Sequence, residues 1–421
     1  MKTLIKAATI VEPGSKYHLK KRDLLIDKGR IEKIAAKIDE SDHKILSHSN
    51  LHVSAGWIDM RANFQDPGFE YKEDLESGMK AAANGGFTGV VLTPFTDPPV
   101  SHKAQVEYII NQTQKNVVRI FPTGTLSQDG KGENLSEMYD MHRSGAVAFS
   151  DDKRSVNRTE MMSRGLDYAR NFDGLVMSFP FDDGVNPGGV MHESAMSVSL
   201  GMRGIPSLAE ELRLKRDIEL LRYHGGKMHV SLISTEKSVD IIRQAKKDGL
   251  AITAGVCAHQ LYFTDEDLKS FDTRLKVLPP FRSKSDVKAL IKGIADGTID
   301  VICSDHTPED VEAKKREFEH AAYGISSIET TFCTAFTKLE KSIDLEKWIL
   351  ALTKNPRSIL GLAPVSIQEG ESVDLTFFDP NGETSLSASD LASKSKNSPL
   401  LDTMLKGKVL GIARGKFLNW K

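Results

Sequence analysis

The residues best able to do chemistry stand where short apolar runs end. One run leads into Arg61 and Asn63, within the stretch DMRANFQDPG. Asp152 follows a second run, and Asp305 follows a third, in the stretch SDHTP. Two carboxylates and an amide oxygen could weakly hold a hard cation such as Mg2+.

Cysteines suggest a second kind of site. Cys257 and Cys303 stand at or near the ends of two later apolar runs, and with Asp305 they could offer thiolate ligands to zinc. Free cysteine is also one of the most buried residue types and packs as a small hydrophobe. We expect the second role. Three scattered cysteines cannot build a disulfide framework or a CxxC metal knuckle, which indicates a reducing compartment.

Other polar residues near strand ends are expected to be structural. His229 precedes a candidate strand end and is expected in the core, while His306 is expected to make structural hydrogen bonds. The pair Lys153-Arg154 and the turn Asp182-Asp183-Gly184 are expected to be solvated loop charges.

Strand ends can meet only if the elements between them form a suitable scaffold. In the middle of the chain, strand-like runs alternate with helical stretches over roughly 300 residues, which is typical of a parallel α/β fold. About eight such units predict a (β/α)8 TIM barrel, in which active groups lie at the ends of the strands. The runs include 89–94, 118–122, 146–150, 227–232, 251–254 and 300–304, and 75–84 is helix-like.

The two ends of the chain have a different pattern. Short alternating segments with Gly turns, typical of β-hairpins, fill residues 1–52 and return near the C-terminus. We predict a small β-sandwich domain built from residues 1–52 and 363–421, with the TIM barrel at 53–362. The polar stretch 382–400 is expected to be a surface loop.

Composition describes an ordinary soluble protein. The chain has 421 residues, of which 39% are hydrophobic and 27% charged, with a net charge of -2. No global field therefore favours nucleic acid or an anionic membrane. No apolar run reaches the ~18 residues of a membrane span, and the first residues are too soon interrupted to be a signal peptide. A cytoplasmic location is expected.

Several stretches together resemble one family. From about residue 54 to 362 they read SAGWIDM…DPG, NGGFTGVVLTPFTDPP, GAVAFSDD, GIPSLAEELRLKRDIELL, HVSLISTEKSVDIIRQAKKDGLAITAGVCAHQLYFTDEDL, DGTIDVICSDHTPED and LTKNPRSILGL. In this order they resemble dihydroorotases of the long bacterial type, in the amidohydrolase superfamily. The resemblance implies a TIM barrel with a β-sandwich. It also implies a zinc enzyme of pyrimidine biosynthesis that closes carbamoyl aspartate to dihydroorotate.

The resemblance also implies six positions for zinc ligands, four histidines and two aspartates. The histidine positions hold Arg61, Asn63, Phe179 and Leu232. The aspartate positions hold Asp305 and either Asp151 or Asp152, of which Asp152 fits the spacing better. Zinc needs about three protein ligands with lone pairs and an open position for water. Arginine has no lone pair to give, and phenylalanine and leucine have no ligand atom. We therefore expect no zinc, and an idle carboxylate at the family's general-base position, Asp305.

The substrate-binding positions implied by the resemblance have changed as well. They fall on Gln65, Phe95, Leu278 and Glu309, where the family has an arginine, two asparagines and a histidine. A neutral amide cannot reproduce the bidentate grip of a guanidinium on a carboxylate. A carboxylate at position 309 would repel an anionic substrate.

The resemblance of their loops implies that Asp152 and Asp305 still converge. Two carboxylates a few ångströms apart repel unless a cation joins them. Arg61 has the reach and the planar fork to bridge both, so we expect its guanidinium within salt-bridge distance of one or both. We expect an apolar wall around it and a small, dry pocket. That wall should comprise Phe179, Leu232, Phe95 and Leu278.

Three functions remain open. The first is a non-catalytic homologue that acts as a structural partner in a homo- or hetero-oligomer, and the resemblance names aspartate carbamoyltransferase as a candidate partner. The second is an altered enzyme that uses Asp152, Asp305 and Asn63 around another metal or none. The third is a working dihydroorotase whose ligands align differently. The histidines in the later motifs, His229, His259 and His306, stand in non-ligand registers, which weakens the third.

Overall fold

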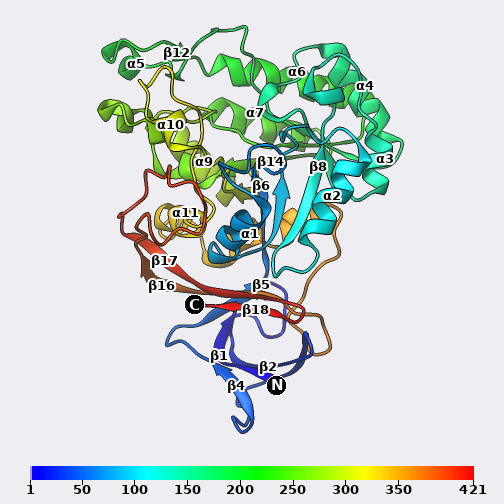
Figure 1. Ribbon diagram of the computed structural model, residues 1–421, viewed down its shortest axis with the longest axis vertical. Coiled ribbons are helices and arrows are strands. Elements are labelled where there is room, and N and C mark those ends of the chain that lie inside the picture. The colour runs from blue at the N-terminus through cyan, green and yellow to red at the C-terminus, as the bar shows by residue number, and fades with distance from the viewer. Residues whose placement is uncertain (1) are drawn as a thin grey trace.

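The computed structural model describes residues 2–421 and has two parts (Figure 1). The chain begins in a β-sheet, which lies at the bottom of the view, and then builds the larger α/β part above it. It ends back in the same sheet, so both termini lie in the lower part. The two β-textured ends of the sequence therefore join one structure, as predicted.

The first part is an eight-stranded sheet from both ends of the chain. Its strands are β1 (Lys2–Ile10), β2 (Lys21–Asp27), β3 (Arg30–Ala35), β4 (His43–Leu46), β5 (His52–Ala55), β16 (Asp374–Thr384), β17 (Leu405–Arg414) and β18 (Phe417–Trp420). The order is β18-β17-β16-β5-β1-β2-β3, and β4 also pairs with β1. One apolar cluster contains side chains from β3 as well as from β17, so the sheet curls over its own core.

The boundary between the two parts lies further along the chain than expected. Residues 53–55 were assigned to the barrel, but they belong to β5, which pairs with β16 in the first sheet. Only Gly56 separates β5 from the first barrel strand. A Cβ there would lie 1.9 Å from Asp374 Oδ1 and 2.1 Å from Thr88 Oγ1, so the crossing requires glycine. Because no turn interrupts the apolar run, sequence alone does not mark the crossing.

The second part is a barrel of eight parallel strands. These are β6 (Trp57–Ala62), β7 (Phe87–Leu92), β8 (Arg119–Gly124), β9 (Ala148–Phe149), β10 (Leu175–Ser178), β13 (Lys227–Val230), β14 (Ile252–Cys257) and β15 (Val301–Cys303). They pair in chain order, and a parallel bridge between Ala62 and His306 joins the last to the first. The predicted TIM barrel is confirmed. A separate parallel pair is formed by β11 (Met191–His192) and β12 (Gly204–Ile205).

Helices connect the strands and cover the outside of the barrel (Figure 1). They are α1 (Leu75–Asn84), α2 (Lys103–Thr113), α3 (Met138–Arg143), α4 (Thr159–Arg170), α5 (Ala195–Ser199), α6 (Leu208–His224), α7 (Glu236–Lys247), α8 (Ala258–Tyr262), α9 (Lys284–Ala295), α10 (Val311–Lys314), α11 (Thr331–Leu339), α12 (Leu345–Leu350) and α13 (Lys354–Ile359). Short 3-10 turns occur at η1 (Gln128–Gly130), η2 (Asp152–Arg154), η3 (Asp265–Ser270) and η4 (Thr273–Leu275). The helix predicted at 75–84 is confirmed, and a reciprocal capping box between Asp74 and Ser77 fixes its start. Within residues 2–421, we find no helix with the length and apolar character needed to cross a membrane.

An aromatic cluster joins the barrel to the sheet. Trp57, the first residue of β6, is fully buried and stacks on Phe332 of α11 at 4.7 Å between ring centroids. Phe378 of β16 lies 5.4 Å from Trp57, and the indole Nε1 donates to Ser54 Oγ at 2.9 Å. Both parts of the molecule therefore share one set of core contacts.

The connection between β16 and β17 is not the simple surface loop expected. Ser393, Ser395 and Asn397 in this connection are buried against the barrel. Ser395 Oγ donates to the carbonyl of Glu309 at 2.6 Å, and Asn397 Nδ2 donates to the carbonyl of Gly324 at 3.0 Å. The segment is polar because its side chains satisfy buried backbone groups, which composition alone cannot distinguish from solvent exposure.

Candidate functional site

Three charged side chains meet at the carboxyl ends of the barrel strands. Arg61 comes from β6, Asp152 follows β9 and Asp305 follows β15, and all three are buried. Arg61 Nε donates to Asp305 Oδ1 at 2.7 Å, and its Nη1 donates to Asp152 Oδ1. The ion pairs expected from the sequence are confirmed, with Arg61 bridging both carboxylates.

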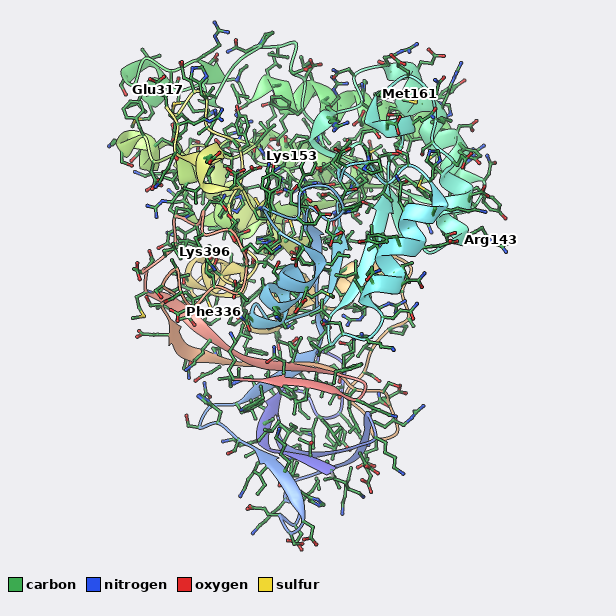
Figure 2. All side chains as sticks on the ribbon, viewed as in Figure 1. Arg143, Lys153, Met161, Glu317, Phe336 and Lys396 are labelled. Atoms are coloured by element: carbon green, nitrogen blue, oxygen red, sulfur yellow. The ribbon has the colours of Figure 1, made fainter. Side chains whose placement is uncertain are left out.

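A second cation completes this cluster. Lys153 Nζ lies 3.1 Å from Asp305 Oδ2, and the lysine side chain is 21% exposed. Figure 2 labels Lys153 within the outline of the barrel part. The prediction that Lys153 is a solvated loop charge is wrong. Asp152 adopts a left-handed backbone conformation (φ 48) in the η2 turn, and this turn places the next side chain over Asp305.

The charges in the cluster balance. Burial alone would raise the pKa of Asp305, but Lys153 and Arg61 outweigh it and hold that pKa below its ordinary value. Burial opposes the charge of Arg61 too, yet Asp152 and Asp305 raise its pKa above the ordinary value. Arg61 and Asp305 therefore stabilise each other in their charged forms.

Asp59, two residues before Arg61 in β6, helps to position the cluster. It was not among the predicted site residues. It is fully buried in β6 and accepts hydrogen bonds from the backbone N–H of Ser304 at 2.9 Å and from Ser304 Oγ. Burial raises the pKa of Asp59 to about 6, against those hydrogen bonds. Its carboxyl ties β6 to the loop that carries Asp305. A carboxylate inside an otherwise apolar run, WIDM, was the available signal.

The remaining family ligand positions offer no metal site. Asn63 Oδ1 accepts a hydrogen bond from the backbone N–H of Gln65 at 3.0 Å, so it shapes its own loop. The ring of Phe179 lies 5.8 Å from Arg61 Cζ, and Leu232 is buried in the same apolar cluster as Phe179. The residues at these positions do not fit the family's zinc, because a guanidinium and two hydrocarbon side chains replace three of the four histidines.

The apolar wall around Arg61 is confirmed in part. Leu278 packs against the cluster that contains Phe179 and Leu232. Phe95 does not join them, and the expectation for this residue is wrong. Its ring lies under the guanidinium of Arg154, 4.0 Å from Cζ, because the loop after β7 turns the side chain toward η2.

Two other positions assigned to substrate binding are already engaged within the protein. Gln65 is buried, and its Nε2 donates to the carbonyl of Pro308 at 3.3 Å. Glu309 is buried and pairs with Lys72 at 2.8 Å. Neither side chain presents the charge that would hold a substrate carboxylate.

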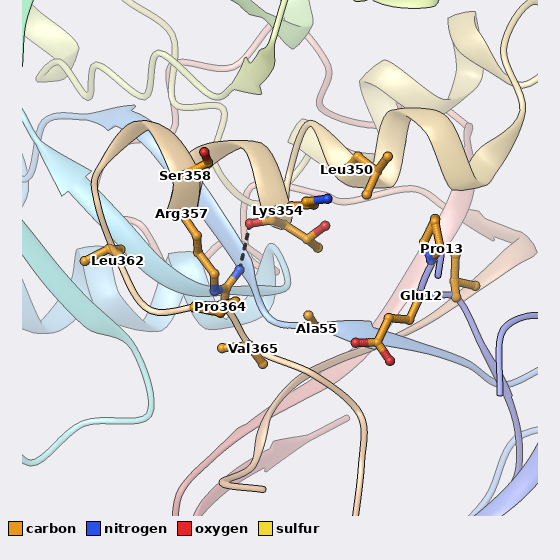
Figure 3. Close-up of a pocket in the computed structure, with 12 residues that line it drawn as sticks. Glu12, Pro13, Ala55, Leu350, Lys354, Arg357, Ser358, Leu362, Pro364 and Val365 are labelled. Atoms are coloured by element: carbon orange, nitrogen blue, oxygen red, sulfur yellow. Dashed lines mark hydrogen bonds between the residues drawn. The ribbon is translucent and has the colours of Figure 1, made fainter. Parts of the chain in front are cut away.

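The cavity directly beside the charged cluster is small. A cavity beside Arg61 and Asp152 has a volume of about 10 Å3, which is room for one water molecule at most. A larger pocket of about 420 Å3 lies where the barrel joins the sheet, at the start of β6 (Figure 3). Arg357 on its wall donates to the carbonyls of Thr353 and Gly56. This pocket is at the opposite end of β6 from the charged cluster.

A cysteine and a histidine lie next to Asp305. One ligand atom from each of Cys257, His259 and Asp305 lies within 4.8 Å of the others, and all three residues are buried. Cys257 Sγ is 3.1 Å from His259 Nε2. Burial lowers the pKa of His259 to about 4 and raises the pKa of the Cys257 thiol well above its ordinary value. The predicted thiolate group was Cys257 and Cys303 with Asp305, and His259 was not part of it.

Two other histidines have the structural roles expected. His229 is buried in β13, and its Nδ1 is 2.8 Å from Thr253 Oγ1. His306 is buried, and its Nδ1 accepts a hydrogen bond from the backbone N–H of Ser327 at 3.1 Å.

Comparison with known proteins gives consistent matches. Residues 51–238 match a family model described as "Dihydro-orotase-like". Dihydroorotases of Ruminiclostridium cellulolyticum and Acetivibrio thermocellus are 39% and 40% identical, over 97% and 96% of this chain and 96% of each relative. Among solved structures, L-hydantoinase (dihydropyrimidinase) from Arthrobacter aurescens is similar with a TM-score of 0.86. It is 20% identical, and the match covers 99% of this chain and 95% of that chain. This likeness supports the fold alone.

Proposed function

The chain belongs to the dihydroorotase family, a family of pyrimidine biosynthesis, and we propose that it is a member that keeps the scaffold without the ring-closing chemistry. The observation that carries this proposal is the guanidinium of Arg61, which joins Asp152 and Asp305 where the family holds its metal. The guanidinium stands at the position of a family ligand and has no lone pair to offer, so the two aspartates cannot be completed into the family's zinc site. The arginine supplies the counter-charge that the two carboxylates need, so the site is stable without an ion.

The surroundings of Arg61 support the same conclusion. The cavity of about 10 Å3 beside it cannot admit carbamoyl aspartate or dihydroorotate. The alternative of an altered enzyme would need Asp152, Asp305 and Asn63 to face a common ion or substrate. Arg61 engages both carboxylates, and Asn63 Oδ1 binds a backbone N–H of its own loop. These contacts favour the hypothesis that the chain is not catalytic.

We expect no interconversion of carbamoyl aspartate and dihydroorotate above the uncatalysed rate. The purified protein should be assayed in both directions with added Zn2+, Co2+ or Mn2+, beside the Ruminiclostridium cellulolyticum dihydroorotase as a positive control. The double variant Arg61→His/Asn63→His should also remain inactive, because Phe179 and Leu232 still offer no ligand atom. Metal-dependent ring closure by the unmodified protein would refute the proposed function.

A chain without the chemistry can be kept for its contacts, and we propose that this one is a structural partner of aspartate carbamoyltransferase. The reason is the family resemblance, together with a sequence that matches its relatives over nearly their whole length. Analytical ultracentrifugation of the two purified proteins from the same organism, alone and mixed at micromolar concentration, provides the test. A faster-sedimenting species should form only in the mixture. Unchanged sedimentation of both proteins would rule out a stable complex.

A further inference from the structure

Two neighbouring barrel strands and the helix that follows one of them bring three metal-ligating side chains together. Cys257 is the last residue of β14 and His259 lies in the first turn of α8, while Asp305 follows β15. The strands β14 and β15 pair in parallel, with Cys257 opposite Cys303. The three side chains therefore reach the same edge of the barrel, with a sulfur, a nitrogen and an oxygen atom within 4.8 Å of one another.

We propose that Cys257, His259 and Asp305 form a binding site for a borderline-soft divalent ion such as Zn2+ or Co2+, and that Lys153 competes with the ion for this site. A thiolate, an imidazole and a carboxylate are a donor set that suits these ions. Cys257 and His259 are not among the ligand positions that the family resemblance implies. The site is therefore new to this chain, and it shares only Asp305 with the family's zinc position.

The position of Lys153 is the reason for calling it a competitor. Its ammonium lies 3.1 Å from Asp305 Oδ2, the carboxylate oxygen that Arg61 does not bind through its Nε. Burial is the largest influence on the pKa of Cys257 and of His259, and the charge of Lys153 lowers both pKa values. The three ligand side chains are buried, whereas the Lys153 side chain is 21% exposed and reaches solvent.

Replacement of Lys153 by the ion leaves the net charge of the site unchanged. Before it, the negative charge of Asp305 is balanced by Lys153, and Cys257 is a neutral thiol. When the ion enters, the Lys153 ammonium moves to solvent and the thiol gives its proton to water. The two positive charges of the ion then match the thiolate and the carboxylate. Arg61 keeps its ion pairs with both Asp152 and Asp305 throughout, so no uncompensated charge is buried.

The site is compatible with a chain that does not turn over substrate. The cavity beside Arg61 has a volume of about 10 Å3 and cannot hold a substrate. When the ion binds, it replaces Lys153 as the cation next to Asp305. Lys153 is then released from the barrel mouth. The inference does not depend on the proposed function.

Optical titration with Co2+ tests the site directly. Metal-free protein should develop a sulfur-to-cobalt charge-transfer band in the near-ultraviolet that saturates at one ion per chain and is displaced by Zn2+. Cys257→Ser should abolish the band, while Cys303→Ser, which removes the buried thiol opposite it, should retain the band. Lys153→Met should bind Co2+ about tenfold more tightly, because the competing charge is gone.

The possible results of the titration lead to different conclusions. No band in the unmodified protein and none in Lys153→Met overturns the proposal, as does a band that survives Cys257→Ser. Circular dichroism identifies a serine variant that has not folded, and Lys153→Met then still decides the question. Failure of this inference appears as a missing optical signal, whereas failure of the proposed function appears as turnover.

Discussion

Replacing Arg61 by alanine should lower the free energy of unfolding by about 3–5 kcal/mol, the cost of stranding a buried charge. Arg61 is 5% exposed, and Asp152 and Asp305 on either side of it are 8% and 3% exposed. Without the guanidinium, only Lys153 remains to balance two carboxylates. Urea unfolding followed by circular dichroism measures the loss. Arg61→Lys should recover only part of it, because an ammonium cannot span both carboxylates as the guanidinium does.

Matched variants isolate the charge effect. Arg164 forms an exposed helical ion pair with Glu160, so Arg164→Ala should cost at most about 1 kcal/mol. Adding Asp152→Asn and Asp305→Asn to Arg61→Ala should restore part of the lost stability, since the repelling charges are removed together. If Arg61→Ala costs no more than Arg164→Ala, the guanidinium does not hold the cluster together.

Trp57→Ala should cost about 3–5 kcal/mol, the range for removing a fully buried large aromatic side chain. Its indole stacks on Phe332 and packs near Phe378, so the cavity would open between the barrel and the sheet. Because both parts share this cluster, we expect the unmodified protein to unfold in one cooperative transition. The variant should show a lower midpoint by calorimetry, and two separated transitions if this contact is what couples the parts.

An exposed aromatic residue provides the comparison. Phe417 in β18 is 43% exposed, so Phe417→Ala should change the unfolding free energy by less than about 1 kcal/mol. An equal loss in the two variants would contradict a special role for Trp57.

The fold could be predicted because its signals are local. Strand–helix alternation gives the barrel, and Asp74 with Ser77 marks the start of α1 at the predicted residue. The crossing from β5 to β6 could not be located, since Gly56 is the only sign of it in a continuous apolar run. Residues 53–55 were therefore placed in the wrong part.

The candidate site could be predicted only for those side chains whose positions are determined by the ends of the strands. The pairing of Arg61 with Asp152 and Asp305 followed from charge and reach. The directions of the side chains in the loops could not be predicted in this way. Phe95 turns away to Arg154, and Lys153 turns inward, because the backbone of each loop decides where the next side chain lies.

His259 shows the same limit at a helix start. In the sequence it is one of several histidines outside the expected ligand register. In the fold, α8 begins directly after β14, and this short step brings the imidazole to within 3.1 Å of the Cys257 sulfur. Cys257 and His259 are two residues apart in the chain. Their side chains meet only because the strand ends between the two residues.

The pairing of β5 with β16 also orders events on the ribosome. β5 is complete at Ala55, but its partner spans Asp374–Thr384, so more than three hundred codons separate the two edges. All eight barrel strands are translated in that interval. The nascent chain therefore carries an open β5 edge throughout barrel synthesis, and the sheet can close only after the barrel has been made. A ribosome that stalls before Asp374 would leave that edge available to other chains.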